Sequence, residues 1–184
     1  MEALHNRVIA GFLCLLIIIA SSALGVVSTL APMRAQVTEL FRVGEGRLPG
    51  VAADLNEIAA QSHNLTVIAG RYLAPDYPAT VRVHEARDNL TRAMQGQFSP
   101  REKRSANNEL VGAAQALHST LSGLELSEQD QNLMATVMAE ISSRMTLISR
   151  SPYNQAAFSF NESLSRFPAN ILGRPFIRPL ELFE

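Results

Sequence analysis

The residues of this sequence that could bind a metal ion or move protons are its histidines and a few carboxylates. The four histidines, of which His5 is the first, are separated by 58, 21 and 34 residues, and none forms an HxH or HExxH motif. Di-iron bundles need a pair of Glu-x-x-His motifs on facing helices, and the sequence contains no such pair. We therefore expect no metal and no cofactor. A ligand-binding or hydrolytic site could still be assembled in the fold from His63, His84, Glu85, His118 and Glu140.

Motifs for nucleophilic catalysis and phosphate binding are also missing from the sequence. No Gly-x-Ser-x-Gly elbow occurs, and the single cysteine, Cys14, lies in an apolar run where a packing role suits it better than catalysis. The stretch from Gly44 to Gly50 has neither a strand before it nor a Gly-Lys-Ser ending, so it indicates a break between helices. The sequence therefore favours a protein that is not an enzyme.

The charge balance argues against partners that are recognised by long-range electrostatics. The chain of 184 residues has 16 basic and 17 acidic side chains, which leaves a net charge of -1. Such a chain lacks the basic surface that nucleic-acid phosphates require, so we expect no nucleic-acid partner. Its length suits one domain, or one domain with an anchor.

An uncharged apolar run from Val8 to Val27 is the strongest compositional feature of the chain. Its 20 residues would span about 30 Å as an α-helix, which is the thickness of the hydrocarbon core of a bilayer. The run is longer than the apolar region of a cleaved signal peptide, but Ser21-Ser22-Ala23 offers a cleavage-type sequence and keeps that alternative open. We expect residues 8–27 to be a single-pass membrane anchor.

The charges on either side of this run bear on its orientation. Arg7 precedes the run, whereas Arg34, Arg42 and Arg47 follow it. Because positive charge favours the cytoplasmic side, this count leans towards a cytoplasmic location for the C-terminal part of the chain.

Apolar residues recur every three or four positions through most of the remaining chain, which predicts amphipathic helices. We expect the membrane helix to continue to about Gly44, and a second helix to run from Val51 to about Ala74. The expected seams of two later helices are Leu110, Ala114, Leu117, Leu121 and Leu124, and Met134, Met138, Ile141, Met145 and Ile148. Such seams are typical of helices that pack nearly parallel or antiparallel.

Helix starts are marked by capping residues. Ser99-Pro100-Arg101-Glu102 is a capping box that begins one helix, and Ser127 caps the next. Pro152 should kink or break that helix. The sequence thus predicts an all-α protein with a single N-terminal transmembrane helix, an antiparallel four-helix-type bundle and an extended C-terminal tail. The expected parts are an anchor at 1–31, a bundle at 32–168 and a tail at 169–184.

Aromatic residues return at every seventh position near the C-terminus. They are Tyr153, Phe160 and Phe167, and the first two are followed by Asn154 and Asn161. Seven residues are nearly two turns of a helix, so the aromatic side chains should form one stripe and the amides an adjacent one. An asparagine kept in this register predicts a tertiary hydrogen bond.

This C-terminal pattern closely resembles the LemA family, whose members end in a YN, YN, FP progression and a tail that closes on Phe-Glu. Leu48-Pro49 is similar to the Leu-Ile-Pro turn of that family, residues 83–87 to its EAR helix and residues 106–110 to its AENxL helix. The chain departs from the pattern at Phe160, which replaces a tyrosine, and at Pro152, so it resembles a diverged member. The resemblance implies a bacterial inner-membrane protein with one anchor and a helical bundle, and leaves the molecular activity open.

Two interpretations of the C-terminal motif follow. The aromatic residues could close the bundle while the asparagines bind the backbone of the adjoining tail, or the same side chains could bind a partner. The sequence favours a non-enzymatic adaptor or scaffold with an unidentified protein partner at the membrane, and a lipid-sensing or membrane-remodelling role is a further alternative. The candidate residues for interaction or structure are Tyr153, Asn154, Phe160, Asn161, Phe167, Pro168 and Asn170.

Overall fold

The computed structural model describes the backbone of residues 2–46, 48–96 and 98–183, and side chains from residue 9 onward within these ranges. The side chains of His5 and Arg7, and all of Arg47, lie outside the described residues. The described chain is all-α apart from one short hairpin, which confirms the expected fold class. Its contacts group into two compact units, namely Met1–Thr38 with Gln155–Leu180, and Glu39–Asn154 with Glu181–Glu184. We call them unit 1 and unit 2.

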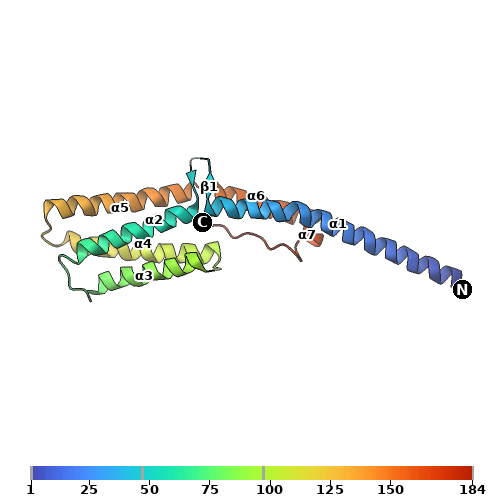
Figure 1. The fold of residues 1–184 in the computed structure, drawn as a ribbon, viewed down its shortest axis with the longest axis horizontal. Coiled ribbons are helices and arrows are strands. Elements are labelled where there is room, and N and C mark those ends of the chain that lie inside the picture. Colours follow the sequence, from blue (N-terminus) through green and yellow to red (C-terminus); the bar gives the residue numbers. More distant parts are fainter. Residues whose placement is uncertain (1, 47, 97, 184) are drawn as a thin grey trace. The chain divides into compact units, whose positions relative to one another are not determined.

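Unit 2 contains a bundle of four long helices: α2 (Val51–Ala69), α3 (Pro78–Gln95), α4 (Pro100–Ser122) and α5 (Glu128–Ser149). Helix α3 packs mainly on α4, and α2 mainly on α5 (Figure 1). The core is formed by the apolar stripe of each helix, because those side chains leave water when the helices pack. Large side chains that are fully buried in this core include Leu55, Ile58, Leu65, Leu90, Leu110, Leu117, Leu121 and Ile141.

The expected helix starts are confirmed. The Ser99 hydroxyl accepts a hydrogen bond from the Glu102 N–H at 3.3 Å, and the Ser99 N–H donates to the Glu102 carboxylate at 2.8 Å. Ser127 caps α5 by accepting from the Asp130 N–H at 3.2 Å. The chain leaves α5 at Ser149, and Pro152 begins α6 (Pro152–Ser165), so the break expected at this proline is present.

Two expected helix boundaries are wrong. Helix α2 ends at Ala69, about one turn before the expected end, because Arg71 and Tyr72 lie in turns from which their side chains reach α5. Leu124, expected in the seam of α4, lies beyond the end of that helix and is 39% exposed.

The glycine-rich stretch forms a two-stranded antiparallel hairpin, β1 (Gly44–Glu45) with β2 (Leu48–Pro49). The sequence indicated only a helix break here. Gly44 has a φ of 91°, and a Cβ at this position would lie 2.2 Å from the Leu48 carbonyl oxygen. A residue with a side chain is therefore excluded at position 44.

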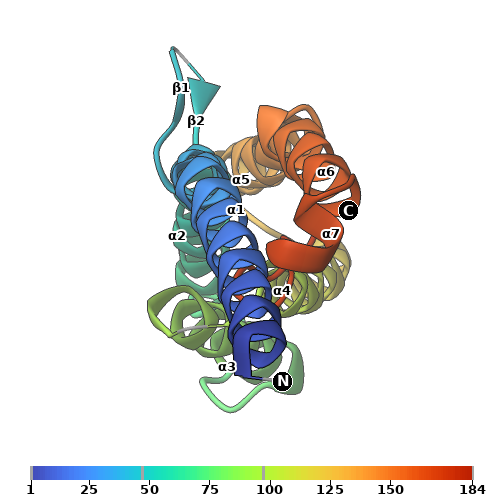
Figure 2. The ribbon, with the colours of Figure 1, turned by 90° about the vertical axis from the view of Figure 1, so that its right-hand side faces the viewer.

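Unit 1 contains most of α1 (Glu2–Arg42), most of α6, and α7 (Ala169–Leu172). The expected continuation of the N-terminal helix is confirmed as far as Arg42, with Pro32 inside it. The helix is long and apolar enough to cross a membrane, and none of its most apolar window is buried. Figures 1 and 2 show α7 beside α1, where a Cβ on Gly173 would lie 3.0 Å from Val26 Cγ1.

Candidate functional site

Helix α6 positions the aromatic and amide residues of the C-terminal motif. Tyr153 and Phe160 are each only 1% exposed, so the first two members of the aromatic stripe are buried as expected. Asn154 and Asn161 follow them and are half-buried, which leaves their amide groups able to reach the backbone of another segment. That segment is the C-terminal tail.

In unit 1, Asn161 binds the tail with both ends of its side-chain amide. Its Nδ2 donates to the Leu180 carbonyl at 2.7 Å, and its Oδ1 accepts from the Leu180 N–H at 2.8 Å. This two-bond pattern is the one that a neighbouring strand would offer to an extended residue. Asn161 therefore holds the tail as a strand partner would.

In unit 2, Tyr153 and Asn154 bind the last described residues of the chain. The Tyr153 hydroxyl donates to the Glu181 carbonyl at 2.7 Å, and Asn154 Oδ1 accepts from the Phe183 N–H at 2.7 Å. Phe183 is 5% exposed and its ring lies 5.7 Å from that of Phe41. These contacts, with those of Asn161, are the tertiary hydrogen bonds expected from the asparagine register. We call Asn154, Asn161 and their tail partners the asparagine clamp.

The aromatic group around Phe41 also includes a lysine. The rings of Phe41 and Tyr153 meet edge to face at 5.1 Å, and Lys103 Nζ lies 5.3 Å from the centre of the Phe41 ring. Burial lowers the pKa of Lys103, since a desolvated ammonium is less stable. The contact with the ring face favours the charged form and opposes that effect.

The remaining three candidate residues are not held in this way. Phe167 is 79% exposed, so its expected place in the buried aromatic stripe is wrong. The reason is that α6 ends at Ser165, two residues before Phe167, and the helical register ends with it. Pro168 follows a cis peptide bond, and both Pro168 and Asn170 are exposed.

A cavity of about 380 Å³ adjoins the clamp in unit 2. Asn107 is fully buried on its wall; its Nδ2 lies 3.2 Å from Met145 Sδ, and its Oδ1 has no hydrogen-bond partner in the described structure. A buried acceptor without a partner destabilises the fold, so this atom is suited to a water or a ligand N–H. The sequence marked Asn107 only through the family resemblance. The cavity is also lined by Arg104, Asn108, Ile148, Ser149, Asn154 and Phe183.

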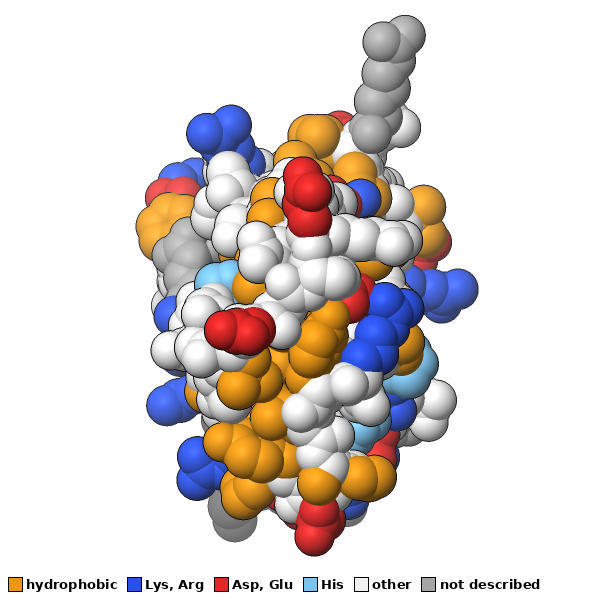
Figure 3. Space-filling view, turned by 90° about the vertical axis from the view of Figure 1, so that its left-hand side faces the viewer, with side chains coloured by type: hydrophobic (Ala, Val, Ile, Leu, Met, Phe, Trp, Pro, Cys, Tyr) orange, Lys and Arg blue, Asp and Glu red, His pale blue; other side chains and the backbone are white. Residues whose placement is uncertain are grey.

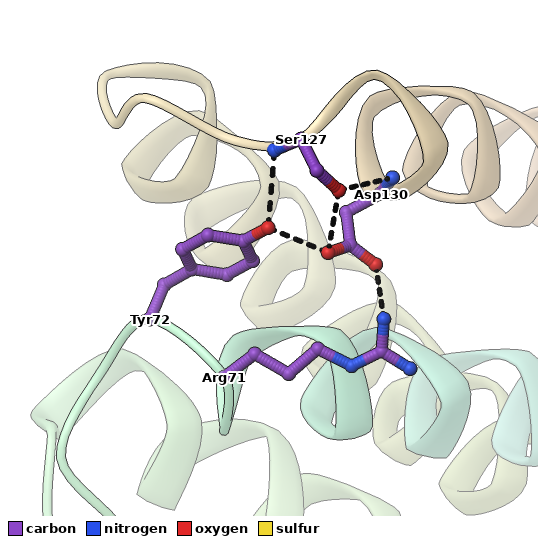
Figure 4. A network of polar contacts seen from close by, with 4 residues as sticks. All are labelled: Arg71, Tyr72, Ser127 and Asp130. Carbon is purple, nitrogen blue, oxygen red and sulfur yellow. Dashed lines mark hydrogen bonds and ion pairs between the residues drawn. The ribbon is translucent and has the colours of Figure 1, made fainter.

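A buried carboxylate ties the start of α5 to the end of α2 (Figure 4). Asp130 accepts a hydrogen bond from the Tyr72 hydroxyl at 2.5 Å and forms an ion pair with Arg71. The bond from Tyr72 is the main cause that lowers the pKa of Asp130, with help from Ser127 and Arg71. A lowered pKa stabilises the fold above about pH 4, the unfolded value, and this contribution is lost as the pH falls through the folded pKa.

A second buried carboxylate behaves in the opposite way. Asp54 on α2 is 2% exposed and accepts a hydrogen bond from Arg144 of α5 at 3.2 Å, while Arg144 also pairs with Glu140. Burial raises the pKa of Asp54, and Arg144 only partly opposes it. Because the folded pKa is raised, the contribution of Asp54 to stability is complete below about pH 4 and is lost as the pH rises through the folded pKa.

Neither aspartate was predicted from the sequence to be buried, although a signal existed. Asp54 directly precedes Leu55 on an apolar stripe that also includes Val51 and Ile58, and Asp130 is four residues before Met134. A carboxylate on the buried side of a helix predicts a basic or hydroxyl partner on the facing helix. Both groups connect helices within the bundle.

The residues that could have assembled a hydrolytic site are distributed over four helices. His63 is on α2, His84 and Glu85 on α3, His118 on α4, and Glu140 on α5. Three cavities among the described residues, including the one beside Asn107, are lined by none of them. Within the described side chains, no group of three potential metal ligands comes together.

Comparison of the chain with family models, with curated proteins and with solved structures finds no match.

Proposed function

We propose that this protein is a single-pass, membrane-anchored helical bundle that acts as an adaptor or scaffold, a diverged relative of the LemA family at the bacterial inner membrane. The observation that carries the proposal is the apolar part of α1. Its large apolar side chains are exposed from Ile9 to Leu24, with Leu24 at 72% and Ile17 at 63%. A surface of this extent is costly in water and stable in lipid, which supports a membrane anchor.

Membrane retention of the full chain tests the anchor. We expect the intact protein to stay in the membrane pellet after alkaline carbonate extraction and to keep its N-terminal residues by mass spectrometry. The matched control carries Ile17→Arg together with Ile18→Arg at the centre of the run, where charge is most costly. This double variant should be extracted from the membrane. Release of the unmodified chain, or cleavage after Ala23, would contradict the anchor.

Two buried carboxylates and an exposed apolar patch of unit 2 support the adaptor role. The buried carboxylates of Asp54 and Asp130 each bind an arginine across the α2–α5 pair, which fixes how these two helices pack. Figure 3 faces the end of the bundle where the loops lie and shows apolar side chains gathered there among charged ones. Exposed residues of the segments at this end include Tyr77 at 37%, Leu124 at 39% and Leu133 at 41%. An apolar patch with a polar rim suits a protein partner.

Site-specific photocrosslinking in native membranes tests this role. A photoreactive residue at Leu133 should give a defined product with a membrane or membrane-associated protein, which mass spectrometry then identifies. The control places the same residue at Gln115, an exposed position on α4. The product should be lost in Leu124→Lys. Absence of a product at Leu133, or equal products at both positions, would refute the adaptor role.

The side of the membrane can be measured with the same chain. We propose a cytoplasmic bundle, on the basis of Arg34 and Arg42, which lie just beyond the apolar run. A cysteine introduced at Gln115 in a Cys14→Ser background should react with an impermeant maleimide only after the cells are opened. Labelling in intact spheroplasts would reverse the orientation.

A further inference from the structure

The segment from Arg166 to Arg178 has a composition unlike the rest of the chain. It contains three arginines and no acidic residue. Its large apolar side chains point to solvent, with Phe167 79%, Ile171 63% and Phe176 69% exposed. Arg166 pairs with Glu162 at 2.5 Å, whereas Arg174 and Arg178 make no ion pair with any described side chain. We call residues 166–178 the arginine–aromatic segment.

The other side of this segment packs within unit 1. Ala169, Gly173 and Ile177, each four residues from the next, are buried. A Cβ on Gly173 would lie 3.0 Å from Val26 Cγ1 and 3.3 Å from Leu30 Cδ1 of α1. Arg34 Nε donates to the Arg178 carbonyl at 3.3 Å. The segment therefore lies against a defined stretch of α1, and its exposed side chains are held on the opposite side.

That stretch of α1 is where the apolar run ends. The apolar run finishes at Val27, polar Ser28 and Thr29 follow it, and the next charged residue is Arg34. Gly173 lies so close to α1 that an added Cβ would meet Val26 and Leu30, so the segment lies at the level where a spanning helix leaves the hydrocarbon and enters the headgroup layer. This layer favours aromatic rings that are partly immersed and guanidinium groups that bind phosphate.

We propose that the arginine–aromatic segment docks on the bilayer that α1 spans, with Ile171, Phe167 and Phe176 in the headgroup layer and Arg174 and Arg178 on the phosphates of anionic phospholipids. The inference rests on the proposed membrane anchor and adds a lipid-binding site to it. The exposed apolar groups, the two arginines without an ion pair and the contact with the end of the apolar run all favour a lipid surface over a protein partner. Glu181, which would oppose docking, lies three residues beyond the segment.

The test measures membrane depth at single positions of the full-length chain. An environment-sensitive fluorophore is attached to Ile171→Cys in a Cys14→Ser background, and the protein is reconstituted into vesicles of phosphatidylcholine alone or mixed in equal parts with phosphatidylglycerol. Lipids with a spin label near the headgroup quench only a fluorophore that reaches that layer. Phe158→Cys, also in unit 1 and 61% exposed, is the matched surface control. Ile17→Cys reports the anchor itself; because position 17 would lie near the centre of the bilayer, its quencher is a lipid with the spin label near the end of the acyl chain.

We expect blue-shifted emission and strong quenching at position 171, and neither at position 158. Quenching at 171 should be stronger with phosphatidylglycerol, and Arg174→Gln with Arg178→Gln should remove that difference. The charge-matched control, Arg82→Gln with Arg101→Gln, should leave it unchanged. Circular dichroism verifies that each variant is folded.

The outcomes separate the two proposals. Quenching at position 17 without quenching at 171 would overturn the lipid-docking proposal and leave the anchor standing. Absence of quenching at position 17 would overturn the anchor, and lipid docking with it. Equal quenching at 171 in both lipid mixtures would overturn the role assigned to the two arginines.

Discussion

The asparagine clamp makes a quantitative prediction about the C-terminal tail. Asn161→Ala removes two hydrogen bonds to the backbone of Leu180, whereas Asn154→Ala removes one bond to the backbone of Phe183. A hydrogen bond of this kind contributes about 1 kcal/mol net. The local free energy of opening should therefore fall by about 2 kcal/mol at Leu180 and by about 1 kcal/mol at Phe183.

Amide hydrogen exchange of the full chain in detergent micelles measures both effects. A loss of 1.4 kcal/mol is about tenfold in an equilibrium constant. Exchange of the Leu180 amide should thus be about 30-fold faster in Asn161→Ala, and exchange of the Phe183 amide about fivefold faster in Asn154→Ala. The control is Asn170→Ala, which alters an exposed asparagine beyond α6.

The pattern across the two amides decides the interpretation. If each variant accelerated mainly its own amide, the two asparagines would act as separate bonds on one tail. If Asn161→Ala left the Leu180 amide unchanged, the tail would be held by side-chain burial and the reasoning above would be refuted.

Three further predictions concern the bundle. Leu117→Ala and Ile141→Ala should each lower the free energy of unfolding by about 2 to 5 kcal/mol, because both side chains are buried; unchanged guanidinium denaturation curves would show that the core is assigned wrongly. The free energy of unfolding of the wild type minus that of Asp130→Asn should rise with pH near pH 4, because the pKa of Asp130 is lowered in the fold. The same difference taken with Asp54→Asn should fall with pH, because the pKa of Asp54 is raised. Denaturation at a series of pH values measures both differences, and slopes of the same sign would refute the prediction. Asn107→Leu should raise the melting temperature, since it removes a buried acceptor without a partner, and a lower melting temperature would show that a water or ligand satisfies that atom.

The periodic and local features of this chain were predictable from the sequence. The seams that contain Leu117 and Ile141, and the Ser99 cap, depend on residues within a few positions of one another, so spacing alone identifies them. The register of Asn154 and Asn161 also indicated a tertiary bond, although it could not specify which tail atoms accept or donate.

The features that the sequence missed depend on contacts between distant residues. The end of α2 at Ala69 is coupled to the ion pair of Arg71 with Asp130, which joins residues 59 positions apart. The exposure of Phe167 follows from where α6 ends and the chain turns, which a seven-residue repeat does not reveal. The hairpin at Gly44 is too short to give an alternating pattern.

In the bundle, α3 packs on α4 and α2 packs on α5, so the inner pair in the sequence lies between the two members of the outer pair. This order determines which helices can associate first. Helices α3 and α4 are only four residues apart in the sequence and can associate as soon as both have formed, whereas α2 and α5 are separated in the sequence by that whole pair. Closing the larger loop costs more chain entropy, so the inner pair is the natural nucleus. The ion pair of Arg71 with Asp130 can form only once α5 has reached α2, so it belongs to the later step of assembly.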